Sequence, residues 1–194
     1  MWMLFDDARE AGAPPRLYRR PVEVIVAREH DQILPALERV RAGLRAGHHA
    51  AGYLAYEASH AFDPKLRKSA RQGEGSLLCF GLFDGFETPD LARLLPSPDA
   101  AFVGPPRPRI AEGDYSAAVG RVREHLFAGD FYQANLTFGC DVAVAGDPLA
   151  LYSRLRRSAK AGWGAVLVHD QGAIVSLSPE QFFTIHHGLV EARP

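Results

Sequence analysis

Residues 129–136, which read GDFYQANL, gather several polar side chains in one short segment. Asp130, Gln133 and Asn135 stand close together there, where a helix is expected to end and a strand to begin. The cluster is a candidate for substrate chemistry. Gly129 can equally end the helix while Asp130 ties down loop amides, and the residues alone favour this structural interpretation.

A second segment, residues 176–183 (SLSPEQFF), contains a single carboxylate, Glu180, directly after Ser178 and Pro179. Apolar strands are expected on both sides of it, and the proline stiffens the turn between them. Glu180 is therefore either an exposed turn residue or an acid partly shielded from water, a state that suits proton transfer near neutral pH. The residues alone leave both alternatives open.

Other common catalytic and metal-binding patterns are absent from the sequence. It has no phosphate-binding glycine loop, no dinucleotide fingerprint and no G-x-S-x-G elbow. The pairs His48–His49 and His186–His187 cannot each chelate one metal, because neighbours on a strand point to opposite faces. Cys79 and Cys140 lie in apolar stretches, so both are expected to be buried thiols.

The 194-residue chain has a formal net charge of -1 and 47% hydrophobic residues, as is usual for a globular protein. This balance argues against an electrostatic surface for nucleic acid or for an anionic membrane. Residues 1–7 do not read as a signal peptide, and no apolar stretch reaches the length of a membrane span. We therefore expect a cytoplasmic protein with neither nucleic acid nor membrane as partner.

The elements around the first segment follow from capping and periodicity. A helix is expected to start at Asp114 and to end at Gly129. The buried side of this helix is expected to consist of Val119, Val122 and Leu126. A long strand is expected over residues 132–144, and a further helix over 147–158, because Asp147 and the proline after it form a strong helix start.

Strands and hairpins are expected around the second segment and in the first half of the chain. The expected strands cover residues 22–27, 49–56, 77–83, 164–169, 173–176, 182–186 and 189–193, with turns at 170–172 and 187–188. A helix that Asp31 caps and Gly47 ends is expected between the first two of these strands. Its buried stripe is expected to be Leu34, Leu37, Val40 and Leu44.

Sheets joined by hairpins, with helices inserted between them, predict an α+β fold. Five prolines between Pro96 and Pro108 exclude a central strand or helix there. We therefore expect a front domain over residues 1–95, a connection over 96–110 and a second domain over 111–194.

At the two polar segments the sequence resembles the chorismate-utilising enzymes. Residues 129–136 match the family signature G-D-x-x-Q-x-N-L, and residues 176–182 match S-x-S-P-E-x-F. Arg193 and Pro194 look like the end of the T-R-P that opens the next signature. The three matches have the order and the spacing of the family.

The first half of the chain is also similar to part of this family. Residues 51–58 (AGYLAYEA), 61–64 (AFDP) and 79–84 (CFGLFD) resemble the front domain of the aminodeoxychorismate synthase component I family. Anthranilate synthase component I is less similar there. The resemblance implies an anthranilate-synthase-like fold of antiparallel sheets with flanking helices, incomplete at the C-terminus, and it indicates the folate branch.

The resemblance also implies a reaction. Chorismate and ammonia would give 4-amino-4-deoxychorismate for para-aminobenzoate and folate synthesis, with Mg²⁺ holding the substrate carboxylate and the leaving hydroxyl. A glutamine amidotransferase subunit would supply the ammonia. Glu180 maps onto the general acid/base of the family. The nucleophilic lysine maps two positions beyond Pro194, and the acidic Mg²⁺ ligands also map beyond it, so the chain alone is expected to have no metal site and no activity.

Some members of the family bind tryptophan between their two domains. The corresponding places here lie near Asp7 and at Gly162, Trp163 and Gly164. The serine of the family is replaced by an acid at the first place, and its proline-rich signature by AKAG at residues 159–162. We therefore expect no tryptophan binding, with Trp163 either filling the pocket itself or serving as a core residue.

Two other interpretations stay open. Anthranilate synthase component I would share these residues, with alanine in place of the lysine two positions beyond Pro194. A non-catalytic remnant or a regulatory module would fit a chain that ends there.

Overall fold

The computed structural model describes residues 1–9, 12–63, 65–66 and 75–193. Pro194 and the side chain of Arg193, both in the expected T-R-P signature, lie outside this described part, and so does Pro64. No helix among the described residues is long and apolar enough to span a membrane.

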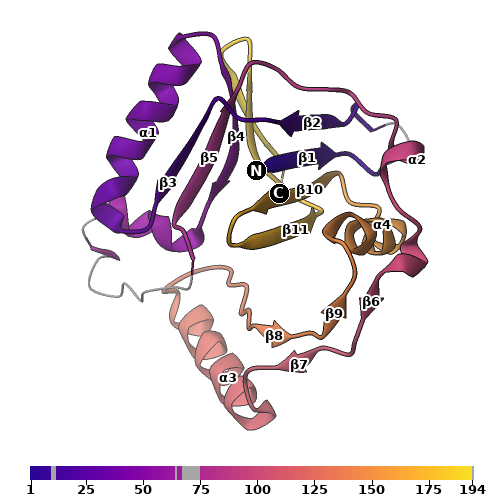
Figure 1. Cartoon of the computed structure of the whole chain (residues 1–194). Helices are drawn as coiled ribbons and strands as arrows, with labels where there is room; N and C mark the ends of the chain where they lie inside the picture. The colour runs from indigo at the N-terminus through magenta and orange to yellow at the C-terminus, as the bar shows by residue number, and fades with distance from the viewer. Residues whose placement is uncertain (10–11, 64, 67–74, 194) are drawn as a thin grey trace.

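Two antiparallel sheets form the body of the molecule (Figure 1). The first has the order β3–β5–β4, with strands Glu23–Ala27, Leu78–Phe83 and His49–Leu54. The second has the order β11–β10–β1–β2, with strands Gly172–Ser178, Trp163–His169, Trp2–Asp6 and Arg16–Arg19. The chain is therefore a mixed α and β protein with antiparallel sheets, as the sequence predicted.

The second sheet joins the start of the chain to residues far along it. β1 pairs with β10 over its whole length, from Trp2 opposite Val168 to Asp6 opposite Gly164. The local pattern does not predict β1, because both faces of this strand are apolar and the polar–apolar alternation of a half-buried strand is missing. The division into domains at residues 95 and 110 stays a prediction.

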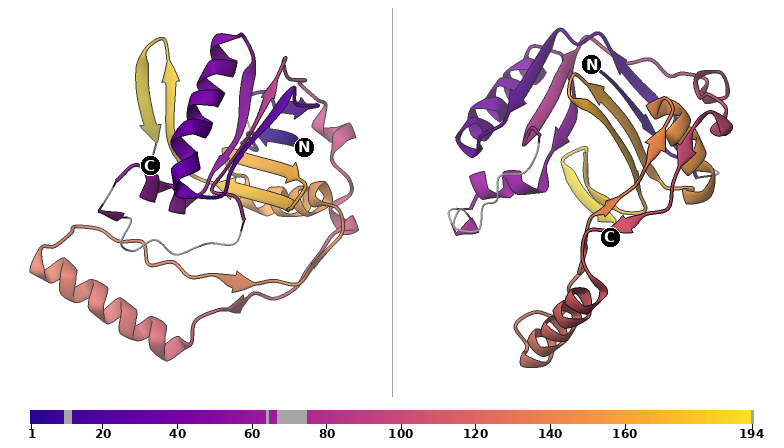
Figure 2. Two further views of the ribbon diagram at one scale, coloured as in Figure 1. Left: turned by 60° about the vertical axis from the view of Figure 1, so that its left-hand side comes forward. Right: turned by 60° about the horizontal axis from the view of Figure 1, so that its bottom comes forward.

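Helices cover the outer faces of the two sheets. Helix α1 (His30–Arg45) packs on the first sheet and α4 (Pro148–Ala159) on the second, so the layers run α1, first sheet, second sheet, α4 (Figures 1 and 2). The core between the sheets consists of Met3, Tyr18, Ala51, Phe83 and Leu167. Burial on both faces explains why the central strands are apolar throughout.

The N-cap of helix α1 lies two residues before the expected cap, Asp31. Its N-cap is Glu29, whose backbone N–H donates to Oε1 of Gln32 at 3.2 Å, while Asp31 lies within the first turn. The expected stop is confirmed, since Gly47 follows the helix with a φ of +95°.

The buried side of α1 differs from the expected stripe. Its fully buried residues are Ile33, Ala36, Val40 and Gly43. Leu34 and Leu44 are each 51% exposed, so the prediction is wrong for them and confirmed for Val40. The physical reason is close packing: the side chain of Leu82 lies only 2.4 Å from where a Cβ on Gly43 would stand. The small-residue side therefore approaches the sheet.

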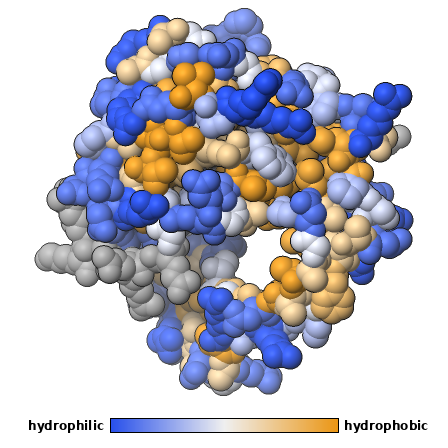
Figure 3. Space-filling view, in the orientation of Figure 1, coloured by the Kyte–Doolittle hydropathy of each residue, from blue (hydrophilic) through white to orange (hydrophobic). Residues whose placement is uncertain are grey.

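Residues 102–145, here termed the arm, extend away from the body (Figure 2). The arm contains β6 (Phe102–Val103), β7 (Arg107–Pro108), α3 (Glu112–Ala128), β8 (Cys140–Asp141) and β9 (Val144–Ala145). Short β6–β9 and β7–β8 pairs join the segment before α3 to the segment after it. The space-filling view shows an opening between the arm and the body (Figure 3).

Helix α3 has no fully buried residue. Of the expected buried side, Val119 and Val122 are half-buried, whereas Leu126 is exposed, so the prediction is wrong for Leu126 and only partly met for the two valines. The helix begins at Glu112 with Ala111 as its N-cap rather than at Asp114. It has no core beneath it, because the arm extends from the body instead of packing against a sheet.

The long strand expected over residues 132–144 is also wrong. Only β8 and β9 are strands in this range, because β6 and β7 offer just two pairing residues each. Cys140 lies in β8 and is exposed, whereas Cys79 is buried, so the expectation of two buried thiols is confirmed for one of them.

The remaining short elements connect the body to the arm and end the chain. A short helix α2 (Leu91–Leu94) and two 3-10 helices (Tyr56–Ala61 and Pro98–Ala100) lie in the connections. β12 (Gln181–His186) and β13 (Leu189–Arg193) form the expected last hairpin. Its apolar side chains stay open to solvent: Phe182 is 88% and Leu189 75% exposed.

Candidate functional site

Glu180 lies at the junction of β11 and β12. The Ser178 hydroxyl donates to the carbonyl oxygen of Glu180 at 2.9 Å, and the Glu180 N–H donates back to the same hydroxyl at 3.1 Å. These two bonds fix the backbone on either side of Pro179. The residue itself is exposed, as in the first of the two alternatives that the sequence left open.

The GDFYQANL segment begins at the C-terminal end of α3. Gly129 adopts the left-handed conformation, with a φ of +80°, and ends the helix. The carboxylate of Asp130 contacts Nδ1 of His125 at 2.7 Å, and its N–H donates to the His125 carbonyl. These two residues therefore have the structural roles that the sequence favoured.

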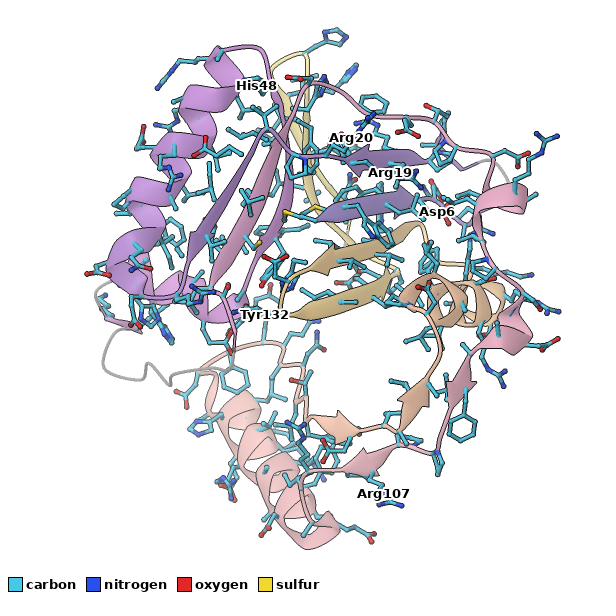
Figure 4. The ribbon with its side chains drawn as sticks, in the orientation of Figure 1. Asp6, Arg19, Arg20, His48, Arg107 and Tyr132 are labelled. Atoms are coloured by element: carbon cyan, nitrogen blue, oxygen red, sulfur yellow. The ribbon has the colours of Figure 1, made fainter. Side chains whose placement is uncertain are left out.

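The other polar residues of this segment lie open to solvent. Gln133 and Asn135 are exposed, and Tyr132 projects beyond the end of α3 (Figure 4). Asn135 lines a shallow groove with residues of α3, among them Tyr115. None of the hydrogen bonds or ion pairs of the described residues joins residues 129–136 to Ser178 or Glu180.

The described residues contain no cluster of metal-ligating side chains. Within this part of the chain, no group of three or more His, Cys, Asp or Glu side chains could hold a metal ion. Mg²⁺ can be held by one or two carboxylates, with water and substrate groups as its other ligands, so the ion stays an expectation of the resemblance.

The structure does bring together the four residues of the expected tryptophan pocket. Asp7, Gly162, Trp163 and Gly164 line one cavity of about 560 Å³. The cavity lies against strands of both sheets, and Thr184 of the last hairpin also lines it. Its volume suits a small organic molecule.

An arginine that the sequence did not single out lies over Trp163 in this cavity. The Arg9 guanidinium stands 5.2 Å from the centre of the indole ring. Arg9, and not Trp163 alone, therefore occupies the space above the indole ring in the cavity. It also binds Asp7 with two bonds, from Nε at 2.8 Å and from Nη2 at 2.5 Å. These bonds from Arg9 lower the pKa of Asp7 from 3.8 to about 2. The only signal in the sequence is that an arginine follows Asp7 after one residue.

A buried polar cluster lies behind the cavity, between β1 and α4. Asp6 accepts from the hydroxyl of Tyr152 at 2.7 Å and from Nε of Arg156 at 2.5 Å (Figure 4 shows Asp6 beside α4). Gly164 is required here, since a Cβ would stand 2.2 Å from the Tyr152 hydroxyl oxygen. Burial, followed by the bond to Asp6, raises the pKa of Tyr152 far above its usual value.

Comparison with known families adds what the geometry alone does not provide. The model of the chorismate binding enzyme family matches residues 7–194, which is nearly the whole chain. The chain belongs to the chorismate binding enzyme family. The segments around Gly129 and Glu180 both lie within the matched residues.

Several relatives carry the name aminodeoxychorismate synthase component 1. The protein of Klebsiella aerogenes is 31% identical over 88 residues, 45% of this chain and 20% of that protein. The protein of Salmonella typhimurium is 36% identical over 81 residues, 42% of this chain and 18% of that protein. Anthranilate synthase component 1 of Haloferax volcanii is 30% identical over 81 residues, 42% of this chain and 16% of that protein. The matched part of this chain thus spans about a fifth of the relatives' own length.

Proposed function

We propose that this chain belongs to an aminodeoxychorismate synthase component I with an anthranilate-synthase-like fold. The protein would convert chorismate and ammonia to 4-amino-4-deoxychorismate in para-aminobenzoate and folate biosynthesis. The observation behind this proposal is the family match over residues 7–194, combined with relatives of that name. A cytoplasmic location and a glutamine amidotransferase partner belong to the same proposal.

Glu180 is proposed as the general acid/base. Hydroxide is a poor leaving group, so a carboxylic acid that protonates the departing hydroxyl contributes a factor of about 100 to 10,000. Two features support the role. The Ser178 bonds hold the backbone of Glu180 in place, and the segment matches the S-x-S-P-E-x-F signature.

Mg²⁺ stays part of the proposal only through the family. When bound, it would polarise the substrate carboxylate and the leaving hydroxyl. The described residues contain no group of three or more His, Cys, Asp or Glu side chains that could hold it. The proposal places its ligands, and the nucleophilic lysine, beyond Pro194.

Glu180→Gln tests the acid/base role in the protein encoded by the complete gene. We expect turnover to fall by a factor of about 100 or more, with chorismate binding nearly unchanged, because the amide keeps the shape but cannot donate the proton. Glu124→Gln, on the exposed surface of α3, is the matched control and should keep wild-type turnover. Turnover of Glu180→Gln within a factor of two of wild type would exclude the assignment.

Anthranilate synthase component I is the second candidate, favoured by the Haloferax relative. Sequencing the gene beyond the Pro194 codon separates the two, since lysine two positions on favours aminodeoxychorismate and alanine favours anthranilate. A product assay with chorismate, ammonium and Mg²⁺ is the second test. Anthranilate as the product would refute the proposed function.

A further inference from the structure

The signature segment around Glu180 contains two serines that the sequence does not distinguish. Ser176 and Ser178 both precede Pro179, and both lie in β11. Residues two apart on a strand lie on the same face of the sheet, so the pattern predicts the same surroundings for both serines. The structure gives them different partners.

The hydroxyl of Ser178 closes a ring with the backbone of Glu180. It accepts a hydrogen bond from the Glu180 N–H at 3.1 Å and donates one to the Glu180 carbonyl oxygen at 2.9 Å. The residue between them, Pro179, has no N–H of its own. One side chain thus provides partners for both backbone polar groups of the proposed acid/base residue.

These two bonds connect Glu180 to the second sheet. Ser178 is the last residue of β11 and lies opposite Trp163 of β10, whereas β12 begins only at Gln181. Glu180 lies between the two strands and belongs to neither strand pairing. Since the pairing with β10 holds Ser178, its hydroxyl fixes the backbone of Glu180 relative to a rigid strand. A proton donor needs support of this kind to keep its place.

Ser176 has no comparable contact with Glu180. It lies opposite Ala165 in the same strand pair, and it is exposed. Among the hydrogen bonds of the described residues, none involves the hydroxyl of Ser176. Ser176 therefore provides a matched control for Ser178, with the same residue type in the same strand.

We infer that Ser178 is a positioning residue for proton transfer at Glu180, and that Ser176 is not. The inference rests on the proposed function, in which Glu180 is the general acid/base. Ser178 acts through Glu180, because its hydroxyl holds the backbone that carries the carboxylic acid. Without the hydroxyl this backbone is free to move, and a misplacement of about 1 Å in an active site can lower the rate by a factor of about 100.

Steady-state kinetics of the protein encoded by the complete gene test this role, with chorismate, ammonium and Mg²⁺. Ser178→Ala should lower kcat about 10- to 100-fold and change KM by less than about twofold, because only the placement of the proton donor changes. Ser178→Thr keeps the hydroxyl and should keep kcat within about threefold of wild type. Ser176→Ala should keep the wild-type kcat. Wild-type kcat in Ser178→Ala, or an equal loss in Ser176→Ala, would overturn the inference.

A double-mutant cycle with Glu180→Gln separates positioning from a general structural effect. If Ser178 acts through Glu180, Ser178→Ala should lower kcat by less than about twofold when the acid is already absent. Equal losses with and without the acid would refute the positioning role while leaving the proposed function intact. Wild-type turnover of Glu180→Gln would instead refute the proposed acid/base role, and the inference with it.

Hydrogen exchange at the Glu180 amide, followed by NMR on the 194-residue chain, tests the bond without an activity assay. The amide should exchange about fivefold faster in Ser178→Ala than in wild type, a factor that corresponds to the loss of one hydrogen bond. Ser178→Thr and Ser176→Ala should exchange at the wild-type rate. Circular dichroism shows whether each variant folds, and Ser178→Cys, with its weakly bonding thiol, replaces the alanine variant if that one does not. An unchanged exchange rate in the folded variant would overturn the inference.

Discussion

The bond between Tyr152 and Asp6 is expected to stabilise the second sheet, and Tyr152→Phe removes only this bond. Tyr152 is fully buried, its hydroxyl donates to the carboxylate at 2.7 Å, and the Asp6 side chain is 2% exposed. A hydrogen bond to a charged group contributes about 1.5–3 kcal/mol. Since Asp6 keeps Arg156 and the phenyl ring keeps its packing, we expect the free energy of unfolding to fall by about 2 kcal/mol.

Urea unfolding followed by tryptophan fluorescence measures this loss directly. The two tryptophans of the chain are Trp2 in β1 and Trp163 in β10, so the signal reports on the sheet that the bond stabilises. Tyr56→Phe is the matched control, because Tyr56 is 88% exposed, and it should stay within about 0.5 kcal/mol of wild type.

A double-mutant cycle with Gly164→Ala tests the geometry behind this number. In the wild-type protein the new Cβ would stand 2.2 Å from the Tyr152 oxygen, and overpacking of this kind costs about 1–3 kcal/mol. Without the oxygen, the nearest atoms lie at 3.1 and 3.3 Å, so the alanine should cost at least about 1 kcal/mol less. A loss below about 0.5 kcal/mol for Tyr152→Phe, or strict additivity with Gly164→Ala, would refute the reasoning.

Three further measurements follow from the structure. One equivalent of a thiol reagent should react with the native protein, at exposed Cys140, because burial shields Cys79 and raises the pKa of its thiol. The second equivalent should react only in urea, and rapid reaction of both thiols in the native protein would contradict the structure. Asp7→Asn should lower the midpoint of urea unfolding at neutral pH, because the pKa of Asp7 is lower in the folded than in the unfolded chain. The difference in midpoint between the variant and the wild type should vanish as the pH falls from 3.8 to about 2, and a difference that stays constant would exclude the ion pair as its cause. Hydrogen exchange should be slow in β1 and β10 and fast over residues 112–139, where no α3 side chain is fully buried, and uniform protection would show that the arm packs on the body.

Local signals in the sequence predict the start of α4, the helix stops and the hairpin turns well, but not the starts of α1 and α3. Asp147 accepts from the N–H of Leu149 at 2.8 Å and starts α4 as expected, and Gly129 ends α3 in the left-handed conformation. The turn at residues 170–172 joins β10 to β11. Each of these features depends on atoms within a few residues, so their preferences are present in the local chain.

The candidate site is predicted less completely. The two signature segments place the chain in its family, and the structure locates Glu180 and Gly129 without joining their segments by a hydrogen bond or ion pair of the described residues. The pocket residues Asp7 and Trp163 do lie together, but Arg9 was missed. Periodicity says nothing about a side chain that folds back over a distant ring.

The sequence by itself determined the family, the α and β character, and most helix ends and hairpin turns. Only the tertiary structure decided that β1 pairs with β10, that the small-residue side of α1 faces the sheet, and that Arg9 occupies the cavity. It also decided that α3 buries none of its side chains completely. The reason is physical: caps and turns are satisfied by neighbouring residues, whereas burial and strand pairing depend on partners far away in the chain.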